Sequence, residues 1–204
     1  MNRLPSLLLC SFLLPFAAQA APETNHLAVG QPVPAVVVRT DTGKELQLRE
    51  AISAKPTVLI FYRGGWCPYC TRHLAALAEA EAELTAAGFQ LIALSPDQPA
   101  KLRAKPLHQK LRYTLLSDSE MKAARGFGVA FRADDALVAK YKNDYGIDLE
   151  GDSGQAHHLL PRPSVFIVDR AGVIRFAHVN PDYKVRLKPE EILAAAKAAL
   201  GQGK

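Results

Sequence analysis

The segment that most constrains this chain is a cysteine pair, Cys67-Pro68-Tyr69-Cys70, which lies between an apolar run and a long alanine-rich stretch. Residues 57–62 are almost continuously apolar, which is typical of a central strand buried on both faces. Pro68 suits the first position of a helix because its missing N–H costs nothing there, and Gly88 is a good stop. The sequence therefore predicts a strand, a tight turn and a helix over residues 68–87, with the cysteines at the helix start.

This placement has a chemical consequence for the two sulfurs. If Cys67 is the N-cap, its sulfur can accept a hydrogen bond from the backbone N–H of Cys70, and that bond and the helix dipole both favour the thiolate. Cysteines of Cys-x-x-Cys motifs at helix starts have pKa values lowered from about 8.5 to roughly 3.5–7.5. Arg63 adds positive charge nearby, and Cys70 is well placed as the resolving partner.

Two other uses of a cysteine pair are less favoured. A disulfide that closes a loop of four residues adds little stability, so a structural staple is a poor interpretation. A structural zinc site needs four ligands, and the chain has no second Cys-x-x-Cys motif. His157 and His158 are adjacent, and adjacent histidines usually point in different directions. We therefore predict a redox-active dithiol with no metal and no cofactor.

The first twenty residues have the pattern of a secretory signal peptide. Arg3 gives a positive start, residues 7–14 form an apolar run, and Ala18-Gln19-Ala20 offers a small-residue cleavage site before Ala21. The apolar run is too short for a good membrane span, and an uncleaved anchor is the alternative. Cleavage would leave 184 residues and remove Cys10. We expect export to an oxidising compartment, the periplasm of a Gram-negative cell, with membrane contact only during export.

The rest of the chain alternates predicted strands and helices, which favours a single α/β domain over residues 21–204 with a mostly parallel sheet. The net charge of +5 comes from scattered residues, so no nucleic-acid partner is expected. Residues 126–163 are interpreted as an insertion, with a helix at 134–145 and a loop at 146–155. The other expected strands are 33–39, 45–48, 89–94, 113–116, 164–169 and 173–179. The other expected helices are 48–54, 99–111, 119–125 and 189–201.

Several motifs together give the chain a family resemblance. The strand, the Trp66–Cys70 segment, the helix and the later strand that starts at Pro163 resemble the thioredoxin superfamily. From His26 to Leu200 the chain resembles the AhpC/TSA peroxiredoxin family, and in particular a branch with an Arg-Gly-x-Trp-Cys-Pro-Tyr-Cys motif. The further motifs are Val29-Gly30-Gln31-Pro32-Val33-Pro34, Asp41-Thr42-Gly43-Lys44, Phe61-Tyr62-Arg63-Gly64, Leu116-Ser117-Asp118 and Val168-Asp169-Arg170-Ala171-Gly172.

The resemblance implies a thioredoxin-like α/β fold with a central mixed β-sheet flanked by helices. It also implies that Pro163 is a cis-proline facing the cysteines, and that Trp66, Pro68, Tyr69 and Pro163 line the site. From the residues alone, Trp66 is interpreted as a packing wall beside the dithiol. His73, one helical turn beyond Cys70, is interpreted as a surface residue.

The chain departs from the peroxiredoxin pattern at the site itself. Members of that family typically carry Pro-x-x-x-Thr-x-x-Cys, and here Arg63 stands at the proline, Cys67 at the threonine and Cys70 at the attacking cysteine. The peroxiredoxin pattern thus makes Cys70 the nucleophile, whereas the thioredoxin pattern makes it Cys67. For the arginine that stabilises the thiolate, Arg162 and Arg63 are the two candidates, and ordinary solvated arginines are the alternative.

Three functions remain open from the sequence. The leading hypothesis is an exported thiol oxidoreductase that reduces hydroperoxides through a Cys67–Cys70 disulfide cycle and is itself reduced by a thioredoxin-like donor. The second is a thiol–disulfide reductase acting on protein disulfides, with Cys67 attacking. The third is a copper-binding assembly factor, although such carriers usually separate their cysteines by three residues.

Overall fold

The computed structural model of the chain describes residues 26–104 and 111–201. The expected signal peptide with Cys10, and residues 105–110 of the expected helix at 99–111, lie outside this description. Over the described residues, no helix combines the length and the apolar character that crossing a bilayer requires.

The core of the fold is a seven-stranded mixed sheet in the order β2-β1-β5-β4-β3-β8-β9. The central strands β3, β4 and β5 are parallel, and the four remaining pairings are antiparallel. The mixed sheet implied by the family resemblance is confirmed, and the mostly parallel sheet expected from the alternation is wrong, because a hairpin occupies each edge. The strands are β1 (Val37–Arg39), β2 (Glu45–Gln47), β3 (Thr57–Phe61), β4 (Gln90–Ser95), β5 (Thr114–Ser117), β8 (Ser164–Val168) and β9 (Ile174–Val179).

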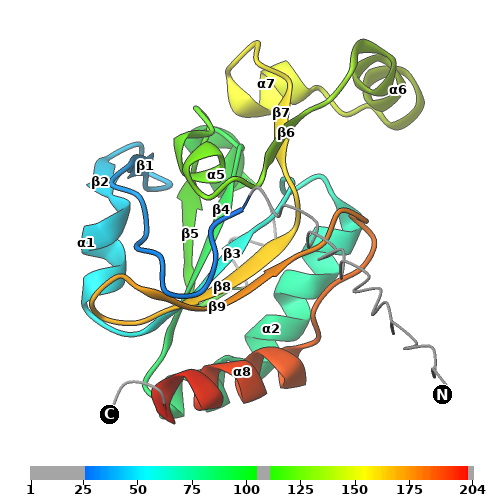
Figure 1. Cartoon of the computed structure of the whole chain (residues 1–204). Coiled ribbons are helices and arrows are strands. Elements are labelled where there is room, and N and C mark those ends of the chain that lie inside the picture. Colours follow the sequence, from blue (N-terminus) through cyan, green and yellow to red (C-terminus); the bar gives the residue numbers. More distant parts are fainter. Residues whose placement is uncertain (1–25, 105–110, 202–204) are drawn as a thin grey trace, which may run out of the picture.

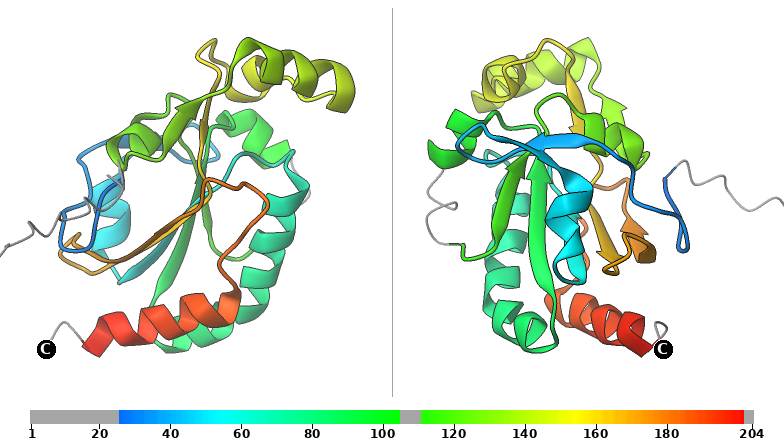
Figure 2. Two further views of the ribbon diagram at one scale, coloured as in Figure 1. Left: turned by 45° about the vertical axis from the view of Figure 1, so that its right-hand side comes forward. Right: turned by 90° about the vertical axis from the view of Figure 1, so that its left-hand side faces the viewer.

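Helices cover both faces of this sheet, as Figures 1 and 2 show. Alternate residues of β3 point to opposite faces: Val58 and Ile60 pack with α2 and α8, whereas Leu59 and Phe61 pack with α1 and α5. A strand buried on both faces must be apolar at every position, which explains the continuous run. The helices of the two layers are α1 (Leu48–Ser53), α2 (Pro68–Ala86), α3 (Pro99–Ala104), α5 (Lys122–Gly126) and α8 (Pro189–Gly201).

Three phenylalanines hold α5 to the sheet beneath the site. Phe61, at the end of β3, has its ring centroid 5.0 Å from that of Phe127 and 6.0 Å from that of Phe166, and the last two are 4.9 Å apart. All three side chains are buried. The tilted and edge-on geometries are those that aromatic rings prefer.

Within the expected insertion at 126–163, residues 130–161 form a small unit that stands beyond one end of the main sheet in Figure 1, whereas Phe127 and Val129 pack in the main core. Two unexpected strands, β6 (Ala130–Arg132) and β7 (Leu159–Pro161), form an antiparallel ladder. The predicted helix is present as α6 (Asp135–Tyr145). The predicted loop at 146–155 is wrong because it contains α7 (Leu149–Ser153).

The helix α7 forms because short polar signals surround it. The Asp148 side chain accepts a hydrogen bond from the N–H of Gly151, and Gly154 ends the helix with φ of 69°. Leu149 then joins Tyr141 in a separate apolar cluster against which Trp66 packs. The unit therefore rests directly on the turn that carries the cysteine pair.

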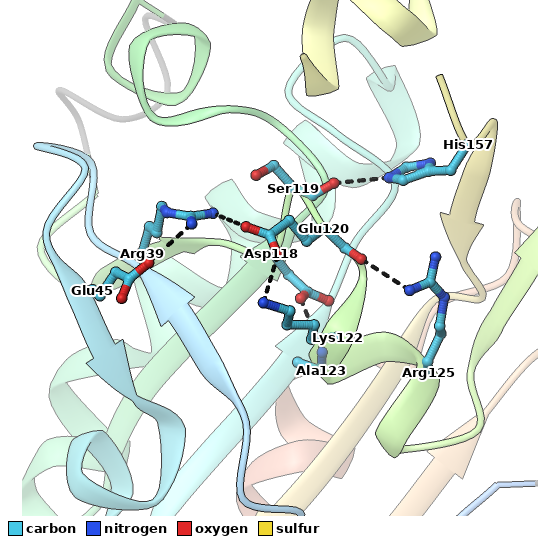
Figure 3. A network of polar contacts seen from close by, with 9 residues as sticks. All are labelled: Arg39, Glu45, Asp118, Ser119, Glu120, Lys122, Ala123, Arg125 and His157. Carbon is cyan, nitrogen blue, oxygen red and sulfur yellow. Dashed lines mark hydrogen bonds and ion pairs between the residues drawn. The ribbon is translucent and has the colours of Figure 1, made fainter. Parts of the chain in front are cut away.

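A polar network joins this unit to α5 and to the sheet edge (Figure 3). Glu120 contacts Arg39 of β1 and Lys122 of α5, and the ring of His157, just before β7, donates to the carbonyl of Ser119 at 2.8 Å. The helix expected from Ser119 begins only at Lys122, because the Asp118 carboxylate accepts the N–H groups of the first helical turn. The hydrogen bond from His157 to Ser119 thus ties the start of β7 to the segment that precedes α5.

We predict that Phe127→Ala lowers the free energy of unfolding by about 3–5 kcal/mol, because it removes a ring that is fully buried against two others. Urea denaturation measures the change. Val29→Ala, at an exposed valine, is the control and changes stability by less than about 0.5 kcal/mol. Equal losses in the two variants would contradict the packing described.

Candidate active site

Cys67 lies at the N-cap of α2, as the sequence predicts. Its Sγ accepts a hydrogen bond from the backbone N–H of Cys70 at 3.4 Å, and Pro68 occupies the first helical position. Both cysteines are free thiols and both are buried, Cys67 at 2% exposure and Cys70 at 0%. The pair is therefore shielded from bulk water.

The surroundings of Cys67 favour its thiolate. The hydrogen bond from the Cys70 side chain is the largest cause, and together with the Cys70 backbone N–H and the charges of Arg63 and Arg186 it lowers the pKa of Cys67 to about 6, against the opposing effect of burial. At neutral pH this sulfur is therefore mostly ionised and nucleophilic.

Cys70 has the opposite character. Burial raises the pKa of its thiol well above the ordinary value, and the neighbouring Cys67 raises it further. A guanidinium N–H of Arg186 donates to the Cys70 Sγ at 3.3 Å and partly offsets these effects. The site thus pairs one thiolate with one protonated thiol in hydrogen-bond contact.

Arg63 is buried inside an aromatic enclosure. Its guanidinium lies 4.4 Å from the ring centroid of Tyr183, 5.4 Å from that of Tyr141 and 5.5 Å from that of Trp66, and it donates to the Tyr141 hydroxyl. The structure brings Arg63 to the site as predicted, and its charge lowers the pKa of Cys67. Trp66 forms one wall of this enclosure, in line with its interpretation as a packing wall.

A buried carboxylate positions the turn between β3 and α2. Asp97, just after β4, accepts hydrogen bonds from the N–H of Gly65 at 2.8 Å and from the hydroxyl of Ser95 at 3.0 Å. Asp97 is a positioning residue that the sequence did not reveal.

The same turn requires glycine at position 64. Gly64 adopts φ of +142°, and a Cβ there would lie 2.4 Å from the indole nitrogen of Trp66.

Two further residues that the sequence predicted at the site are Pro163 and Arg162. Pro163 is buried and lines a cavity together with Arg63, but no cis peptide bond occurs among the described residues, so the expected cis-proline is wrong. The guanidinium of Arg162 lies over the Phe131 ring and 3.5 Å from the Ala130 carbonyl, so its contacts are with β6 rather than with sulfur. Its role at the thiolate stays a prediction.

His73 is not the surface residue that the sequence predicted. It is 8% exposed, and its Nε2–H donates to the Leu187 carbonyl at 3.0 Å. Burial lowers the pKa of His73 to about 4, so the ring is neutral at physiological pH. The loop between β9 and α8 covers this histidine, which no local pattern could indicate.

That loop, residues 180–188, closes the site from the outside. Tyr183 lies over Arg63 and edge-on to Tyr69, with ring centroids 5.8 Å apart, and Arg186 reaches Cys70. Sequence reasoning missed Arg186, Tyr183 and Tyr141, because each acts across a long sequence separation. Among the described residues, no three His, Cys, Asp or Glu side chains cluster as a metal site would require.

The sequence of the chain is similar to those of known proteins. The AhpC/TSA family profile matches residues 29–177. The putative peroxiredoxin bcp of Haemophilus influenzae is 32% identical over 105 residues, which cover 52% of this chain and 67% of that protein. The chloroplastic peroxiredoxin Q of Suaeda salsa is 28% identical over 151 residues, covering 74% of this chain and 59% of that protein, so the chain spans about three fifths of that relative.

Solved structures match the fold over most of the chain. The reduced Prx3 of Vibrio vulnificus in complex with H2O2 has a TM-score of 0.67 at 19% identity, covering 83% of this chain and 99% of that one. The peroxiredoxin Q of Xanthomonas campestris has a TM-score of 0.61 at 22% identity, covering 86% and 98%. The site and fold define a thiol oxidoreductase with a thioredoxin-like architecture. The chain belongs to the AhpC/TSA family, and its curated relatives are named as peroxiredoxins.

We predict that the Cys67 pKa depends on the hydrogen bond from residue 70. In Cys70→Ser the hydroxyl still donates to Cys67, so iodoacetamide alkylation of Cys67 should rise with pH around a midpoint near 6. In Cys70→Ala this donor is lost and the midpoint should rise. Mass spectrometry of the Cys67 peptide measures the rate at each pH. Midpoints near the free-thiol value of about 8.5 in both variants would contradict the assignment.

Proposed function

We propose that the protein is a thiol-dependent peroxidase of the bcp and peroxiredoxin Q type, which reduces hydroperoxides through Cys67 and Cys70. The observation that carries the proposal is the pairing of an ionised Cys67 with a protonated, hydrogen-bonded Cys70 beside two arginines. The Arg-Gly-x-Trp-Cys-Pro-Tyr-Cys motif defines the branch to which we assign it.

The first step is attack by the Cys67 thiolate on the terminal oxygen of the peroxide. An S–O bond forms, the O–O bond breaks, and the leaving alkoxide takes a proton from the Cys70 thiol, which gives an alcohol and a Cys67 sulfenic acid. The positive charges of Arg63 and Arg186 stabilise the charge that develops on the leaving oxygen.

In the second step the Cys70 thiolate attacks the sulfenic sulfur. A Cys67–Cys70 disulfide forms, and the departing hydroxide takes a proton to become water. A thioredoxin-like dithiol then supplies two electrons and two protons by exchange and regenerates both thiols. The N-cap position supports Cys67, rather than Cys70, as the sulfur that attacks.

A cavity of about 260 Å³ beside Arg63 supports an organic hydroperoxide as substrate. Tyr141, Tyr183 and Pro163 line it, and Arg162 and Lys140 add positive charge to that of Arg63. Aromatic walls suit an apolar substrate body, and the arginines suit the polar peroxide group.

A second candidate is a thiol–disulfide reductase acting on protein disulfides. The observation that favours it is the position of Cys67, the more acidic sulfur, where peroxiredoxins typically carry threonine. In that reaction Cys67 attacks the substrate disulfide, and Cys70 releases the reduced product.

We also propose that the protein acts outside the cytoplasm, after removal of residues 1–20. The apolar run and the small residues before Ala21 support this proposal. An oxidising compartment would make reduction of the Cys67–Cys70 disulfide the step that depends on a dedicated donor.

Reduced protein is predicted to consume cumene hydroperoxide far faster than an equal concentration of free thiol. Cys67→Ser should lower the rate to background, because the remaining thiol has a raised pKa. A ferrous-ion peroxide assay under stopped-flow mixing gives the rates. Consumption no faster than free thiol, together with a trapped mixed disulfide between Cys70→Ser protein and a disulfide substrate, would replace the peroxidase by the reductase.

Export predicts that the mature protein begins at Ala21. N-terminal sequencing of protein recovered from the periplasmic fraction of a Gram-negative host tests this. Ala20→Arg, which disrupts the small-residue cleavage site, should leave the longer chain. Recovery of a chain that begins at Met1 in the cytoplasmic fraction would contradict export.

A further inference from the structure

A strongly basic groove lies against the outside of the dithiol. It has a volume of about 390 Å³ and runs between the start of α2 and the loop that precedes α8. Four cationic side chains line it, together with Tyr69 and His73: Arg72, Lys184, Arg186 and Lys188. We call this feature the basic groove.

Little negative charge opposes these cations. None of the described residues that line the groove is acidic, and His73 is neutral because burial lowers its pKa to about 4. The nearby carboxylates act as backbone acceptors: Asp182 accepts the N–H of Lys184 at 2.9 Å, and Glu191 accepts the N–H of Lys188 at 2.8 Å. The side chains of Arg72, Lys184 and Lys188 are exposed.

Two residues of the groove lining connect it to the buried cysteines. Arg186 forms part of its wall and also donates to the Cys70 Sγ at 3.3 Å. Tyr69, also in the wall, lies between the two cysteines in the chain. A molecule bound in the groove therefore lies against Arg186, which contacts the Cys70 sulfur, and against Tyr69, which lies between the cysteines in the chain.

We propose that the basic groove binds an acidic segment of the protein that reduces the Cys67–Cys70 disulfide. The inference rests on the proposed function in that the dithiol must cycle through a disulfide. The groove is an open trough beside the thiols rather than an enclosed cavity, so it suits a polypeptide segment better than a small molecule. Charge complementarity of this kind raises the rate at which partners meet and orients them.

The chemistry of the docked complex is thiol–disulfide exchange. A thiolate of the acidic partner attacks one sulfur of the Cys67–Cys70 disulfide, that S–S bond breaks, and a mixed disulfide forms. The partner's second thiolate then attacks the partner's own sulfur in the mixed disulfide. The partner leaves with an internal disulfide, and the second sulfur of the protein is released. Two electrons pass to Cys67 and Cys70, and the two protons of the partner thiols balance the regenerated thiols.

The test uses two synthetic cysteine peptides of equal length as reductants, one with glutamates flanking its cysteine and one with glutamines. The protein is first oxidised to the disulfide with diamide, so that this test does not depend on peroxide. Rate constants are normalised to the thiolate concentration, because neighbouring glutamates raise the pKa of a thiol. The glutamate peptide should react about tenfold faster at low salt. This advantage should vanish near 1 M salt, where the Debye length is about 3 Å.

The matched variants remove equal charge at two places. Lys184→Gln with Lys188→Gln should abolish the preference for the glutamate peptide, whereas Lys44→Gln with Lys55→Gln, at exposed positions outside the groove, should retain it. Dithiothreitol, whose reacting thiolate carries no flanking carboxylates, should reduce all of these proteins at nearly the same rate. That result shows that the groove lysines act on docking and not on the disulfide itself.

Two results would overturn the proposal: equal rates for the two peptides, and slower reduction by dithiothreitol in the groove variant alone. If the peptides react at equal rates and the protein sediments on phosphatidylglycerol vesicles in a way that the groove variant loses, the surface is a lipid contact instead. Hydroperoxide consumption by the reduced groove variant reports separately on the peroxidase.

Discussion

The site depends on the N-cap of α2, where the Cys67 sulfur accepts a hydrogen bond from the backbone N–H of Cys70. The backbone N–H and the side chain of Cys70 both point toward this sulfur, so the helix start and its partner thiol stabilise the same negative charge. Because the helix itself is held by burial of its apolar stripe against the sheet, the electrostatics of the thiolate rest on the packing of the whole domain.

Two segments from outside the central sheet complete the enclosure. The unit formed by residues 130–161 contributes Tyr141, and the loop of residues 180–188 contributes Tyr183 and Arg186. Arg63 lies between them with its charge surrounded by aromatic rings and little water, so its field at Cys67 is screened weakly. The same loop carries the lysines of the basic groove, so one segment links the surface proposed for docking to the arginine that contacts Cys70.

The sequence predicted what local rules determine. The buried strand, Pro68 at the first helical position and the N-cap role of Cys67 all follow from signals within a few residues, and the structure confirms them. Contacts across the chain were not predictable: Arg186 meets Cys70 across a separation of 116 residues, and His73 is buried only because the loop near Leu187 folds over it. The helix α7 was missed because its composition also suits a loop.

The central claim is that Cys67, and not Cys70, attacks the peroxide. Trapping the sulfenic acid tests it most directly: Cys67→Ser and Cys70→Ser proteins are treated with hydroperoxide and dimedone, and the labelled peptides are identified by mass spectrometry. Dimedone adducts should form on Cys67 in the Cys70→Ser protein, with almost none on Cys70 in the Cys67→Ser protein. Efficient labelling of Cys70 in the Cys67→Ser protein, with none on Cys67 in the other, would contradict the account.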